Sequence, residues 1–194
     1  MVAGHFGLAA AVKSRERAVP FWLLMLACQW LDVVFVPLLL AGVERLQPLP
    51  GTRPGAYGAA VIHADYTHSL VGALLLSILF GAAAIGRYGR RAAIVLALVS
   101  FSHWLLDLPM HRADLPLLPG NVRGFPRLGF GLWRFPAVSA VLELALVIAG
   151  AALYWRAALA VARTDPPRVR RAHVCGAGAL CAGVATLGLN VLGM

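Results

Sequence analysis

Five long apolar segments separated by short basic loops constrain the fold of this chain more than any other feature. They cover residues 18–42, 60–85, 92–110, 136–154 and 173–194. A helix needs about 20 apolar residues to cross the hydrocarbon of a bilayer. Because every backbone polar group there must be paired internally, such segments become helices. We therefore predict an all-α polytopic transmembrane helix bundle of about five spans, forming a single domain over residues 1–194, plus a short N-terminal interfacial or re-entrant helix.

The composition agrees with an integral membrane protein and argues against a nucleic-acid partner. Hydrophobic residues make up 60% of the chain and charged residues 13%, whereas soluble domains carry about 25% charged residues. The net charge of +9 comes from basic residues in the loops between apolar segments. Membrane topology explains such a distribution, so we expect membrane lipid and no nucleic acid as partners.

The Lys and Arg residues also predict an orientation. Eleven of the seventeen fall on the side of the N-terminus: Lys13, Arg15, Arg17, Arg87, Arg90, Arg91, Arg156, Arg163, Arg168, Arg170 and Arg171. The remaining six are Arg45, Arg53, Arg112, Arg123, Arg127 and Arg134. Since basic loops are retained in the cytoplasm, the chain is predicted to be a multi-pass membrane protein with a cytoplasmic N-terminus.

The stretch SHWLLDLPMH, residues 102–111, places titratable groups at the end of an apolar segment. His103, Asp107 and His111 are four residues apart, so they share one face of a helix. A charged group in hydrocarbon costs several kcal/mol unless it has a partner or a cavity. This row of residues therefore points to a buried functional site.

Further polar residues are predicted at the same depth of the bilayer. Asp32, His68, His103, Asp107 and Glu143 all fall between the midplane and the outer third of a core about 30 Å thick. No basic residue lies deep enough in the sequence pattern to neutralise them. Histidine and carboxylate are ligands of zinc, manganese and iron, so we predict a divalent metal, with zinc as the first expectation.

Simpler explanations stay open for each of these residues taken alone. A single histidine in a transmembrane helix is more often a hydrogen-bond partner of another helix than a metal ligand. Glu143 could pair with Arg134 or His68. His63 could lie in the membrane interface.

Several motifs resemble one family. GHFGLAAAVK, ACQWLD, YTHSLVGALL and SHWLLDLPMHRADLPLLPG are similar to stretches of bacterial inner-membrane proteins known as membrane-bound metal-dependent hydrolases, some of whose relatives are called permeases. The resemblance covers about residues 1–155 and leaves the last apolar segment unmatched. It implies a location in the bacterial inner membrane and a set of metal ligands, namely His5, Asp32, His68, His103, Asp107 and His111. His5 can join the others only if its helix is re-entrant rather than flat on the membrane.

The leading interpretation is a metal-dependent hydrolase near the outer leaflet, acting on a lipid-borne phosphoester or another amphiphilic ester. Glu143 or Asp65 would serve as general base. Four loop arginines interleaved with aromatic residues would bind phosphate or anchor to lipid headgroups: Arg112, Arg123, Arg127 and Arg134.

The main alternative is a metal-ion or proton transporter, since titratable residues in membranes also mark ion pathways. A pathway needs polar groups along its whole length, whereas the inner halves of the apolar segments have few. A structural metal in a scaffold protein is a third alternative, so enzymatic activity stays open at this level.

Overall fold

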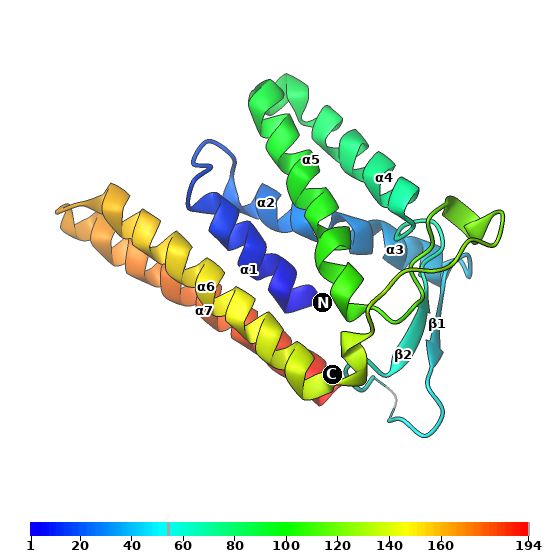
Figure 1. Cartoon of the computed structure of the whole chain (residues 1–194). Coiled ribbons are helices and arrows are strands. Elements are labelled where there is room, and N and C mark those ends of the chain that lie inside the picture. Colours follow the sequence, from blue (N-terminus) through cyan, green and yellow to red (C-terminus); the bar gives the residue numbers. More distant parts are fainter. Residues whose placement is uncertain (54, 194) are drawn as a thin grey trace.

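The computed structural model describes residues 1–53 and 55–193, and over these residues the chain is mainly helical (Figure 1). The helices are α1 (Val2–Lys13), α2 (Phe21–Cys28), α3 (Trp30–Leu40), α4 (Leu70–Ala83), α5 (Ile85–Met110), α6 (Pro136–Ala162) and α7 (Pro166–Leu192). The strands β1 (Arg45–Pro48) and β2 (Ala60–His63) pair antiparallel. Two 3-10 turns follow α5, η1 (Pro119–Asn121) and η2 (Leu132–Arg134). The predicted helical bundle is confirmed.

The prediction of five spans is wrong. Within the described residues, α5, α6 and α7 are long and apolar enough to cross a membrane, and the pair α2–α3 adds a fourth span only if its 51° bend is allowed. These helices suit a membrane-embedded protein. The 14 residues of α4 extend for only about 21 Å, less than the hydrocarbon thickness of about 30 Å.

The segment at 60–85 fails as a span because its apolar start is not helical. Residues 60–63 form β2, whose His63 lies opposite Arg45 of β1. The helix begins only after Ser69, whose hydroxyl accepts a hydrogen bond from the Gly72 amide at 3.0 Å, a standard N-cap. His68 therefore lies in the connection before α4 and not inside a helix.

The N-terminal helix α1 packs inside the bundle against α6, beside α5 (Figure 1). Gly7 of α1 and Gly150 of α6 meet so closely that a Cβ atom at Gly150 would fall on the Gly7 carbonyl oxygen. Small residues at a crossing allow backbones to approach in this way. The side chain of His5 is consequently buried, as the re-entrant alternative requires.

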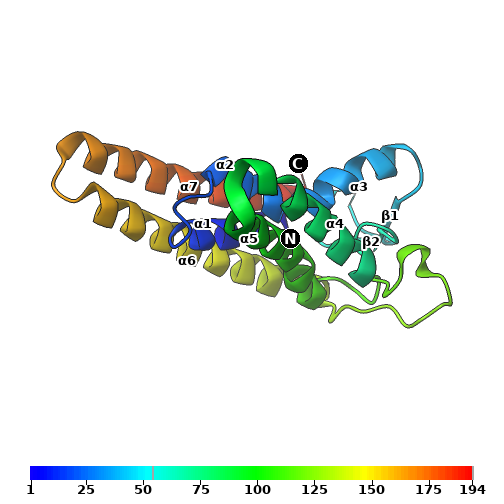
Figure 2. The ribbon, with the colours of Figure 1, turned by 90° about the horizontal axis from the view of Figure 1, so that it is seen from above.

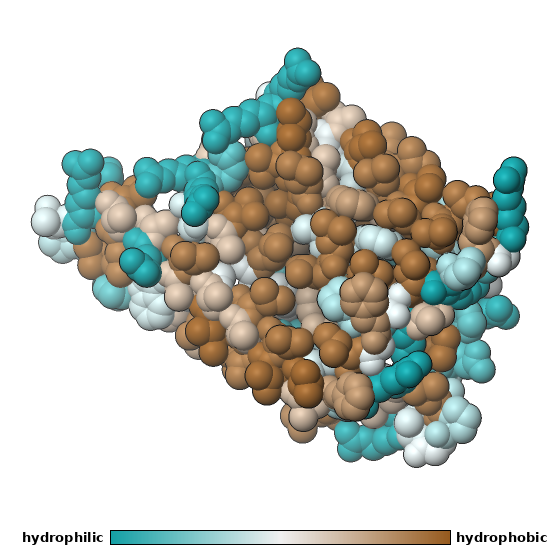
Figure 3. Space-filling model, viewed as in Figure 1, coloured by the Kyte–Doolittle hydropathy of each residue, from teal (hydrophilic) through white to brown (hydrophobic). Residues whose placement is uncertain are grey.

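The ends of the molecule are polar and its middle is apolar. Hydrophilic residues gather at the α4–α5 and α6–α7 turns and around the strands, with an apolar band between them (Figure 3). The long hairpin of α6 and α7 joins the two ends (Figure 2). Glu16 binds Arg91 at 3.0 Å, which links the α1–α2 connection to the α4–α5 end.

We expect the α6–α7 turn to face the cytoplasm, because most basic residues gather at that end. In a background lacking the native cysteines, Arg53→Cys should react with an impermeant maleimide in intact cells. Arg168→Cys should react only after permeabilisation. Labelling of position 168, but not 53, from outside would reverse the orientation.

Candidate metal centre

Asp107 is the centre of a buried cluster on α5. Its Oδ2 atom lies 3.2 Å from Nε2 of His103 and 3.5 Å from Nε2 of His111, each four residues away. All three side chains are buried. The spacing in the sequence thus predicts this face correctly.

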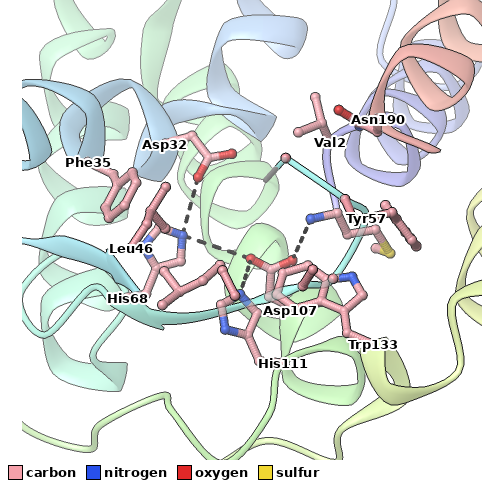
Figure 4. Close-up of a pocket in the computed structure, with 17 residues that line it drawn as sticks. Val2, Asp32, Phe35, Leu46, Tyr57, His68, Asp107, His111, Trp133 and Asn190 are labelled. Atoms are coloured by element: carbon pink, nitrogen blue, oxygen red, sulfur yellow. Dashed lines mark hydrogen bonds and ion pairs between the residues drawn. The ribbon is translucent and has the colours of Figure 1, made fainter. Parts of the chain in front are cut away.

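Three other elements bring further donors to Asp107. His5 of α1 places Nε2 3.2 Å from Oδ1 of Asp107. His68, from the connection before α4, places Nε2 3.3 Å from Nε2 of His103 and 3.5 Å from Oδ1 of Asp32, in the first turn of α3. Figure 4 shows His68, Asp32, Asp107 and His111 converging. The six predicted ligands therefore meet in one place.

The distances among three of these donors suit the ligand spacing of a tetrahedral metal ion. His68 Nε2, His103 Nε2 and Asp32 Oδ1 are separated by 3.3, 3.5 and 3.7 Å. Ligands about 2.0–2.1 Å from a tetrahedral zinc ion lie about 3.3–3.4 Å apart. Asp107 Oδ2 lies 3.2 Å from His103 and 3.9 Å from His68, and Asp107 forms a second, overlapping group of possible ligands with His5 and His103.

Outer hydrogen bonds orient the imidazole rings. Nδ1 of His103 lies 2.7 Å from the Cys28 carbonyl oxygen, and Nδ1 of His111 lies 2.9 Å from an Asp114 carboxylate oxygen. Since carbonyl and carboxylate oxygens only accept, each Nδ1 carries the proton and each Nε2 turns a lone pair inward. Burial by itself lowers the pKa of His111, but without a bound cation Asp107 and Asp114 outweigh burial and raise it to about 9, so Nε2 of His111 presents its lone pair only when a metal ion displaces the proton there.

His68 is oriented by a carboxylate that the sequence did not reveal. Glu44, which is 1% exposed, accepts hydrogen bonds from the amides of Tyr66 and Thr67 and from the Thr67 hydroxyl. Because that hydroxyl donates to Glu44, its oxygen accepts from Nδ1 of His68 at 2.9 Å. The Nε2 lone pair of His68 then also faces the cluster.

This arrangement brings hydrogen-bond acceptors of the histidines and aspartates close together. The Nε2 lone pairs of His68 and His103 approach each other beside the carboxylates of Asp32 and Asp107, which is unfavourable without a cation or additional protons. The α-amino group of Met1, 3.4 Å from Oδ1 of Asp107, balances part of the negative charge. The donor set as a whole fits a divalent metal ion.

A cavity of about 360 Å³ opens onto the cluster (Figure 4). Its polar lining includes Asp32, His68, Asp107, His111 and Asn190. The facing walls are mainly apolar or aromatic and include Phe35, Leu46, Tyr57, Ile62 and Trp133. A ligand in this cavity would touch both the proposed metal donors and a hydrophobic surface.

Glu143 is buried next to the cavity, and hydrogen bonds engage both of its oxygens. Its two oxygens accept hydrogen bonds from the Gly4 amide, at 3.1 Å, and from the Tyr57 hydroxyl. Burial raises the pKa of Tyr57, and the neighbouring Glu143 carboxylate raises it further. Glu143 therefore holds α1 and Tyr57 in place, rather than pairing with Arg134 or His68.

The other predicted base and two of the loop arginines make contacts within the protein. Asp65 forms a two-pronged ion pair with Arg127, at 2.5 and 3.2 Å, which raises the pKa of the guanidinium. Arg112 donates to the Gly58 carbonyl oxygen at 3.1 Å. Among the described residues, the cavity lining includes none of the predicted base and substrate residues of this region, namely Asp65, Arg112, Arg123, Arg127 and Arg134.

Fold and site together define a class: a helical protein with apolar helices of membrane-spanning length and a buried histidine–aspartate cluster that could hold a metal ion. Comparison of the chain with protein-family models, curated proteins and solved structures found no match.

Proposed function

We propose that this protein is a metal-dependent hydrolase of the bacterial inner membrane, with zinc as its metal. Its substrate is a lipid-borne phosphoester or another amphiphilic ester, reached near the outer leaflet. One observation carries the proposal: imidazole and carboxylate donors with inward lone pairs meet beside a cavity whose other walls are apolar. The sequence resemblance to membrane-bound metal-dependent hydrolases supports the same reaction class.

The roles of the side chains follow from their positions. Asp32, His68, His103 and Asp107 hold the metal, while His5 and His111 contact the two oxygens of Asp107 and complete the donor set. A divalent ion supplies Lewis-acid polarisation and lowers the pKa of water toward about 7. The aromatic walls of the cavity exclude water and bind the apolar part of the substrate.

The alternative of a transporter receives less support from the packing. Between Arg91 and Ser100, the buried positions of α5 are all apolar: Ala92, Ala93, Leu96 and Val99. Ala92, Leu96 and Val99 pack with residues of α1 and α2 in one hydrophobic cluster. Polar groups thus occupy one side of the bundle, which favours a one-sided reaction site over a conduit.

We expect zinc-loaded protein in mixed micelles to release product from at least one of three probes: phosphatidic acid, phosphatidylglycerol or a long-chain p-nitrophenyl ester. Chelation and Asp107→Asn should each abolish turnover, because both remove the metal. His63→Ala is the matched control, since His63 bonds Gln47 in the sheet and does not line the cavity.

The same protein in liposomes separates the two functions. Metal-loaded protein that hydrolyses none of the probes, but carries zinc ions or protons across the vesicle membrane, would favour the transporter and contradict the hydrolase.

A further inference from the structure

A second cavity, of about 350 Å³, lies at the far end of the α6–α7 hairpin from the metal centre. It is enclosed by the C-terminal end of α1 and the connection after it, by the last turns of α6 and by the first turns of α7. None of its lining residues belongs to the proposed metal centre, so any ligand here is separate from the hydrolase reaction.

The rim of this cavity is basic. Lys13, Arg17, Arg168 and Arg171 all contribute to its lining. The Lys13 ammonium donates to the carbonyl oxygens of Arg17 and Val19, at 2.8 and 2.7 Å, and so fixes the connection that carries Arg17.

The nearby carboxylates leave most of this positive charge uncompensated. Glu16 is bound to Arg91, and Asp165 is bound to Arg168 at 3.0 Å. Over residues 1–53 and 55–193, Arg17 and Arg171 have no carboxylate within ion-pair distance. Two guanidinium groups are therefore available to an anion, and guanidinium groups bind phosphate oxygens well.

The floor of the cavity is apolar. Small side chains of α6 and α7, Ala157, Ala158 and Ala172, line it together with Tyr154. Small residues leave a furrow between helices into which an acyl chain fits. A cationic rim above an apolar furrow is complementary to an amphiphile with an anionic head.

We propose that this cavity binds an anionic phospholipid, with its phosphate at Arg17 and Arg171 and an acyl chain along the furrow of α6 and α7. The cavity lies at the end of the bundle that holds the excess of basic residues. Basic pockets between membrane helices on the cytoplasmic side bind anionic lipid headgroups. The site would tie the hairpin and the end of α1 to the inner leaflet.

Native mass spectrometry of the full-length protein in detergent tests this proposal. Wild-type protein should bind phosphatidylglycerol in preference to phosphatidylcholine. The double variant Arg17→Gln/Arg171→Gln should weaken phosphatidylglycerol binding by about 10- to 30-fold, because each basic residue contributes about a fivefold increase in affinity. Ala158→Leu, which narrows the furrow, should also reduce binding. Unchanged zinc content would show that these variants fold.

The control is Arg15→Gln/Arg156→Gln, which removes the same charge from exposed positions outside the lining and should leave lipid binding unchanged. Equal losses in the two double variants would show only general attraction to anionic lipid and would overturn the site. Complete competition by inorganic phosphate, or no preference for phosphatidylglycerol, would overturn the lipid as ligand.

Discussion

His103→Ala and Asp107→Ala are each expected to lose most of the bound metal. Substitution of a residue that only hydrogen-bonds to a metal ligand typically lowers metal affinity about 10–100-fold, and we expect a larger loss for these two variants. Asp107 contacts four histidines, and His103 contacts His68, Asp32 and Asp107. Removal of either residue leaves the others as buried groups without a cation. Because the two act on one ion, the double variant should cost little beyond the worse single variant.

The measurement is metal content and thermal stability, with and without added zinc, for wild type, both single variants and the double variant. His63→Ala, a histidine in the sheet, is the control and should bind metal normally. Additive losses, with a zinc-induced gain in stability retained in each single variant, would show that His103 and Asp107 do not share an ion. Hydrogen bonding between helices would then explain the row of residues on α5.

Glu44→Ala is expected to have the second largest effect, although Glu44 contacts no proposed metal ligand directly. The substitution leaves the amides of Tyr66 and Thr67 and the Thr67 hydroxyl without their acceptor. Each buried unpaired group costs about 1–3 kcal/mol, so the free energy of unfolding should fall by about 3 kcal/mol or more. His68 also loses its orientation, and metal affinity should fall about 10–100-fold.

Thermal unfolding and zinc titration in detergent measure both effects. Glu44→Gln keeps an acceptor oxygen and should be milder. Glu16→Ala removes a carboxylate that pairs with exposed Arg91 at the other end, so it should leave zinc affinity unchanged. If Glu44→Ala binds zinc as tightly as Glu16→Ala does, the chain from Glu44 through Thr67 to His68 does not support the site.

The sequence predicts most of the site because helical spacing is local. His103, Asp107 and His111 share a face whatever the tertiary structure, and the apolar segments on either side require a bundle. The sequence predicts one depth for Asp32 and His68 on the assumption that each lies in a span, and the two residues meet although His68 lies in a connection. The two residues meet because both lie at the same end of the bundle.

Other features depend on tertiary contacts that no spacing encodes. Glu44 and Asp114 look like ordinary loop carboxylates in the sequence, yet both are buried and orient histidines. The strand pairing of residues 60–63 removes an apolar stretch that would otherwise lengthen α4 into a span. Asp65 and Arg127 form an ion pair although 62 residues separate them in the sequence. Only the folded loop brings them together.

The metal content of protein purified without chelator tests the central claim most directly. We predict a stoichiometric divalent metal ion, zinc, that Asp107→Asn removes and that restores thermal stability when added back to chelated wild-type protein. Protein that contains no transition metal, and binds none on addition, would contradict a metal centre at Asp107.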